Sequence, residues 1–85
     1  MSHDRTLYTI TDELGERTTI TIDKFVADIL QESLSDVHQW VQNTYDRVVN
    51  EQPSYGRRQK GDMVRTLALI EALKTPVSVS ILEEL

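Results

Sequence analysis

Apolar residues alternate with polar ones near the N-terminus and recur at helical spacing further along the chain. Tyr8 and Ile10 share one face of residues 7–11, and Ile20 and Ile22 share one face of residues 18–22, which predicts two strands that are each half-buried. The five residues from Asp12 to Glu16 connect them, and Gly15 is suited to the left-handed conformation of a hairpin loop. The chain is therefore predicted to begin with a β-hairpin. The predicted inward side chains are Tyr8, Ile10, Ile20 and Ile22.

Three helices are predicted to follow the hairpin. The first covers about residues 24–32 and is capped by Asp23, and the second runs from a Ser35 cap to about Asn50. The third runs from about Arg57 or Asp62 to Lys74, because Gly61 weakens its middle. The predicted inward side chains are Phe25, Val26, Ile29 and Leu30, then Val37, Trp40, Val41, Thr44, Tyr45 and Val48, then Met63, Val64, Leu67, Ile70 and Leu73.

Residues 77–81 alternate again after Pro76 and predict either a short third strand or a loose end. The fold class is therefore predicted as α+β, a hairpin or ribbon followed by three helices and a possible C-terminal strand. Residues 1–85 are expected to form one domain, with residues 1–5 and 82–85 as loose ends.

Composition sets further limits on this small domain. With 85 residues, 39% apolar content and no cysteine, it lacks disulfides and thiolate metal sites. We therefore expect it to gain buried area by forming a homodimer. No apolar run is long enough for a bilayer, and no signal peptide is evident. We expect a cytoplasmic protein of bacterial type, with no membrane partner.

Charge disfavours non-specific binding to nucleic acid, because the net charge is −5. The cations are nevertheless clustered, since Arg57, Arg58, Lys60 and Arg65 lie within nine positions. Arg57, Arg58 and Lys60 are candidates for contact with a phosphate backbone. The alternative is a solvated loop and first helical turn.

Residues 17–23 offer the clearest candidate surface. Alternation places Arg17, Thr19 and Thr21 on the face opposite the buried one. A guanidinium and two hydroxyls are able to read base edges in the major groove. The alternative is an ordinary half-buried strand, in which Thr and Ile are favoured in any case.

The sequence from Arg17 to Ile22, the helix that follows and Leu34-Ser35 together resemble the ribbon-helix-helix family of bacterial and plasmid DNA-binding dimers. The resemblance covers about residues 17–50. It implies that one strand from each chain pairs in the major groove, with Arg17, Thr19 and Thr21 reading bases. It also implies that Ser35 and nearby amides hold a DNA phosphate. The expected function is a transcriptional regulator reading a palindromic operator.

Other functions have weaker or different support. His38, Asp36 and Ser35 are too close in sequence to act as a catalytic set, so we expect no enzyme, metal or cofactor. Trp40 and Tyr45 are predicted to pack in the core or in an interface, where they could bind a partner. The alternative function is a protein-interaction module, antitoxin-like or a phage or plasmid accessory protein. Its partner would bind the acidic surface or the terminal strand. A structural protein without a readable function is the third possibility.

Overall fold

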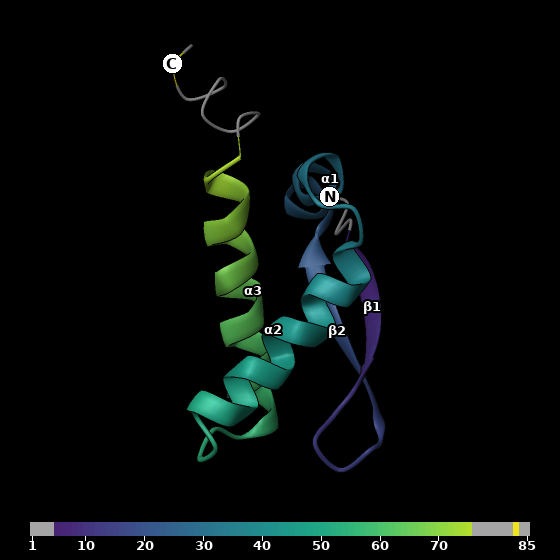
Figure 1. Ribbon diagram of the computed structural model, residues 1–85, viewed down its shortest axis with the longest axis vertical. Helices are drawn as coiled ribbons and strands as arrows, with labels where there is room; N and C mark the ends of the chain where they lie inside the picture. The colour runs from purple at the N-terminus through teal and green to yellow at the C-terminus, as the bar shows by residue number, and fades with distance from the viewer. Residues whose placement is uncertain (1–4, 76–82, 84–85) are drawn as a thin grey trace.

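The computed structural model describes residues 5–75 and residue 83 (Figure 1). In this part of the chain a two-stranded antiparallel sheet precedes three helices, so the fold is α+β. The predicted hairpin and the order of the helices are confirmed, while the predicted strand at 77–81 lies outside the described residues. The elements are β1 (Arg5–Thr11), β2 (Arg17–Asp23), α1 (Lys24–Ser33), α2 (Val37–Glu51) and α3 (Arg57–Leu73).

The hairpin forms within one chain, in a register that pairs Arg5 with Asp23 and Thr11 with Arg17. Its loop is held by Asp12, whose Oδ1 accepts hydrogen bonds from two backbone amides, both at 2.9 Å. Gly15 has φ of +80°, the left-handed conformation that its position predicted. All four predicted inward side chains of the hairpin are buried.

The helices cover only one face of the hairpin. α2 packs on β1, α3 packs beside β2, and α1 contacts both strands (Figure 1). The buried core lies between these layers and includes Leu30, Val41 and Val64, each fully enclosed. Because no described helix covers the opposite face, the outward residues of the strands stay accessible.

The first two helices differ from the prediction at their starts. Phe25 is 68% exposed, and Ala27 is buried on α1 in its place. Asp23 stands at the N-cap position of α1, but its side chain makes no capping hydrogen bond. Asp36, and not Ser35, caps α2, because its carboxylate accepts the N–H of Gln39 at 3.0 Å.

The third helix begins at Arg57 and continues through Gly61, so the alternative cap at Asp62 is wrong. The Gln59 side chain accepts the N–H of Gly56 at 2.8 Å, which satisfies an amide just before the helix. The buried side of α3 follows a four-residue spacing through Lys60, Val64, Ala68 and Ala72. Two predicted inward residues are therefore misplaced: Ile70 is 43% and Leu73 is 49% exposed.

Candidate nucleic-acid interface

The outward face of the hairpin carries the side chains that were predicted to read bases. Arg17 and Thr19 are exposed and Thr21 is half-buried, so none of the described helices covers them. Across the sheet, Thr9 lies opposite Thr19 and Thr11 lies opposite Arg17. These directly opposed pairs place three hydroxyls and one guanidinium on one open surface about two strands wide.

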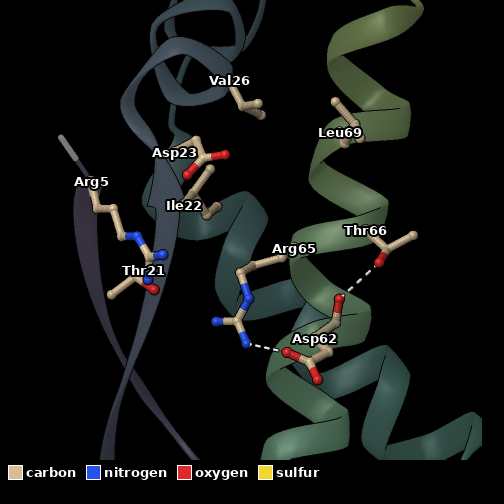
Figure 2. A pocket seen from close by; sticks show the side chains of 9 residues that line it. All are labelled: Arg5, Thr21, Ile22, Asp23, Val26, Asp62, Arg65, Thr66 and Leu69. Carbon is tan, nitrogen blue, oxygen red and sulfur yellow. Dashed lines mark hydrogen bonds and ion pairs between the residues drawn. The ribbon is translucent and has the colours of Figure 1, made fainter. Parts of the chain in front are cut away.

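A groove follows the free side of β2 and separates it from α3 (Figure 2). Its upper part has a volume of about 510 Å³ and its lower part about 180 Å³, and Arg65 lines both. Asp62 on α3 holds Arg65 in an ion pair. The upper part is lined by Arg5, Thr21, Ile22, Asp23 and Val26 from the hairpin side and by Asp62, Arg65, Thr66 and Leu69 from α3.

The lower part of this groove brings together two patches that are far apart in sequence. Thr18 and Thr19 of β2 line it from one side, and Arg57 and Arg58 line it from the other. The arginines are exposed in the first turn of α3, where the helix dipole also favours an anion. The basic run and the polar strand face are therefore adjacent.

Lys60 does not belong to this basic patch. Its side chain is only 10% exposed, and its Nζ forms an ion pair with the Glu13 carboxylate of the hairpin loop. The same carboxylate accepts a hydrogen bond from the Tyr45 hydroxyl at 2.7 Å. Lys60 thus holds the hairpin loop on the helices, and this geometry does not support the predicted phosphate contact of Lys60.

Glu13 and Tyr45, which hydrogen-bond each other beside Lys60, both have shifted pKa values. Hydrogen bonds from Lys60, from the backbone at Glu13 and from Tyr45 lower the pKa of Glu13 from 4.5 to about 2. Burial, followed by the hydrogen bond to Glu13, raises the pKa of Tyr45 above its ordinary value of 10. At neutral pH Glu13 is therefore a carboxylate and Tyr45 a neutral phenol.

The low pKa of Glu13 predicts a specific loss of stability in acid. The carboxylate titrates near 4.5 when unfolded and about 2 when folded, so its contribution is complete above about pH 4.5 and is lost as the pH falls toward 2. Thermal melts between pH 6 and 2 should show a steeper decline in Tm for the parent than for Glu13→Gln. Glu32→Gln, at an exposed position on α1, is the control and should follow the parent. Parallel curves for the parent and Glu13→Gln would contradict this prediction.

Two further predicted contact sites are not supported by the geometry. Ser35 lies between α1 and α2, and the start of α2 is already occupied by the Asp36 carboxylate, which repels an incoming phosphate. Tyr45 is 4% exposed and belongs to the core of the single chain, so it is not free for a partner. Trp40 is half-buried against the same core.

Two side chains of α2, Gln42 and His38, hydrogen-bond the backbone at the β1 edge of the hairpin, a role that the sequence did not indicate for either. The Gln42 amide accepts the Thr11 N–H at 2.8 Å and donates to the Thr11 carbonyl at 2.9 Å. His38 Nε2 lies within hydrogen-bond distance of the Thr9 carbonyl oxygen. Side chains of α2 therefore form the hydrogen bonds that a neighbouring strand would form with the backbone at this edge of β1. The only sequence signal for this role was that His38 and Gln42 are four positions apart and so lie on one face of the helix.

The described residues hold no group of three or more acidic or histidine side chains arranged as metal ligands. Among the same residues, no helix combines the length and apolar character needed to cross a membrane. No family model, no curated protein and no solved structure matches the chain.

Proposed function

We propose that the protein is a DNA-binding regulator that reads duplex sequence with the outward face of its hairpin. The observation that carries the proposal is the shared groove in which Thr19 lies beside Arg57 and Arg58. A two-stranded ribbon has the dimensions to enter the major groove. Arginines at its flank are then placed to contact phosphates, which fix position while the ribbon reads bases.

The arrangement differs from the ribbon-helix-helix resemblance in one important way. There, the ribbon takes one strand from each chain, whereas here both strands belong to one chain. Pairing two such hairpins edge to edge would give four strands, too wide for a groove of about 12 Å. We therefore propose that each subunit of a homodimer brings a complete ribbon, and that two ribbons bind the two halves of a palindrome.

The charge distribution supports specific rather than general binding. With a net charge of −5, the surface repels duplex DNA except where cations gather. The ion pair with Lys60 neutralises Glu13 in the hairpin loop, so this carboxylate opposes the approach of phosphates less than a free one would. Affinity must then come from base contacts together with a few phosphate contacts.

Selection of bound duplexes from a randomised pool tests the proposal directly, because no operator has to be assumed. We expect a palindromic sequence to be enriched. Arg17→Ala and Thr19→Ala should each bind that duplex about tenfold or more weakly, since one base contact contributes about 1–3 kcal/mol of discrimination. Binding to an unrelated duplex should change little.

Arg47→Ala is the matched control, because Arg47 is exposed and lies on α2, away from the groove beside β2. It should bind the selected duplex like the parent. If no sequence is enriched, or if both ribbon variants bind like the parent, the hairpin does not read DNA. The protein-interaction alternative then becomes the leading hypothesis.

A further inference from the structure

Arginine side chains gather at the lower part of the groove beside β2, and none of the described residues that line this part is acidic. Arg57, Arg58 and Arg65 supply three guanidiniums from α3. Within residues 5–75, neither Arg57 nor Arg58 forms an ion pair with a carboxylate. The lower groove is therefore a local site of positive potential on a protein whose net charge is −5.

Arg65 is held at this groove by its neighbour Asp62. One terminal nitrogen of the guanidinium pairs with the Asp62 carboxylate, so the other N–H donors of Arg65 are not used by this ion pair. Asp62 lines the upper part of the groove and not the lower part. Figure 2 shows the Arg65 side chain extending from α3 toward β2. The ion pair thus positions the guanidinium without adding a carboxylate to the lower groove.

Gly61 leaves the space in which the Arg65 guanidinium lies. A Cβ atom at position 61 would be 3.4 Å from Nη2 of Arg65, and a longer side chain in the same direction would displace the guanidinium. Gly61 also lines the lower groove itself. Glycine inside a helix is destabilising relative to other residues. Gly61 therefore weakens α3 but keeps the groove open.

β2 supplies neutral donors from the opposite side of the groove. Thr18 is half-buried on the same strand face as Ile20, and it lines the lower part. Thr19 lies opposite Thr9, whose carbonyl oxygen points outward to His38. Directly opposed residues of an antiparallel pair share this orientation, so the Thr19 amide points to the outer edge of β2. That edge borders the lower groove, and no described residue accepts this N–H.

We propose that the lower groove binds one phosphate group, held by the three guanidiniums, the Thr18 hydroxyl and the Thr19 amide. Guanidiniums bind phosphate oxygens with paired, charge-assisted hydrogen bonds, and hydroxyl and amide donors satisfy further oxygens. The volume of about 180 Å³ is several times the roughly 30 Å³ share of one water molecule, so a phosphate group fits together with bound water.

Two sources can supply this group: the backbone of bound DNA, or phosphate free in solution. The DNA source rests on the proposed function and adds to it. The Thr19 side chain projects from the face of β2 while its amide points to the edge, so one residue can contact a base and the neighbouring phosphate. The groove itself requires no DNA, and phosphate binding is therefore tested separately from base reading.

Titration with inorganic phosphate at constant ionic strength, followed by amide NMR, tests the site without DNA. In the parent, the amides of Thr19 and Gly61 should shift in a saturable way, and replacement by chloride should not shift them. Arg65→Gln should bind phosphate about tenfold or more weakly, because it loses hydrogen bonds to a charged group. Arg47→Gln is the matched control, since Arg47 is exposed on α2 and paired with Glu51, and it should bind like the parent. No saturable shift in the parent, or equal affinity in Arg65→Gln, would overturn the proposal.

Substitution of Gly61 separates phosphate binding from the stability of the helix. Gly61→Gln should bind phosphate as weakly as Arg65→Gln, yet its Tm should equal or exceed that of the parent, because glutamine favours a helix more than glycine does. Gly61→Ala is the matched control. Its Cβ only touches the Arg65 guanidinium, so it should raise the Tm and keep phosphate binding. Equal phosphate affinity in the two Gly61 variants would show that the groove does not hold the phosphate.

Competition identifies the source of the phosphate group. If the groove holds a DNA phosphate, inorganic phosphate should release the selected duplex more effectively than chloride at equal ionic strength, and Arg65→Gln should lose this difference. Equal effects of the two salts, with phosphate binding intact, assign the groove to free phosphate. Phosphate binding without enrichment of any duplex would reject base reading alone. An enriched duplex without phosphate binding would reject only this site.

Discussion

Replacing Lys60 with glutamate is expected to abolish cooperative folding at neutral pH. Lys60 is buried on α3 and its ammonium is paired with the Glu13 carboxylate. The variant would bury an unpaired carboxylate at position 60 and set it beside the Glu13 carboxylate, whose side chain is 34% exposed. Loss of the ion pair, burial of an unpaired charge and repulsion from Glu13 all destabilise the folded state. A domain of this size has only about 4–13 kcal/mol of stability in total.

Circular dichroism and a urea titration would measure this effect. Arg58→Glu is the matched control, because it makes the same change of charge on the same helix at an exposed position. It should keep the urea midpoint close to that of the parent, since a carboxylate in the first turn also suits the helix dipole. A Lys60→Glu variant as stable as Arg58→Glu would show that the pair with Glu13 does not hold the loop to the helices.

Reversing both Arg57 and Arg58 to glutamate is expected to eliminate the proposed DNA binding while the fold is retained. Two attractive phosphate contacts become two repulsive ones beside Thr19, so affinity for every duplex should fall about a hundredfold or more. Replacing both residues with alanine instead should flatten the plot of log affinity against log salt by about two units. Fluorescence anisotropy at several salt concentrations measures both quantities.

The control for this prediction must separate local contacts from net charge. Arg47→Glu/Lys74→Glu changes the net charge equally at two exposed positions that do not line the lower groove. It should weaken binding far less than the Arg57 and Arg58 variant. Equal losses in the two variants would mean that general repulsion, and not contact at the groove, sets the affinity.

The amino-acid sequence determined where most elements begin and end. Apolar residues two positions apart identified both strands because the described helices cover one face of the hairpin. Gly15 identified the loop because few other residues adopt its positive φ. The open face with Arg17 and Thr19 followed from the same alternation. These features depend on neighbours in the chain, so local reasoning was sufficient.

Packing between distant elements decided the remaining features. α3 carries apolar residues around much of its circumference, and the small side chains of Ala68 and Ala72 face the other elements while Ile70 and Leu73 stay exposed. In the sequence Lys60 belongs to a basic run, whereas in the fold it lies beside Glu13 of the hairpin loop. When a helix has apolar residues on several faces, helical periodicity does not show which face is buried. It also does not show which charges that are distant in sequence form ion pairs. Contacts between elements select among those faces because they fix which side chains lose water and which charges meet.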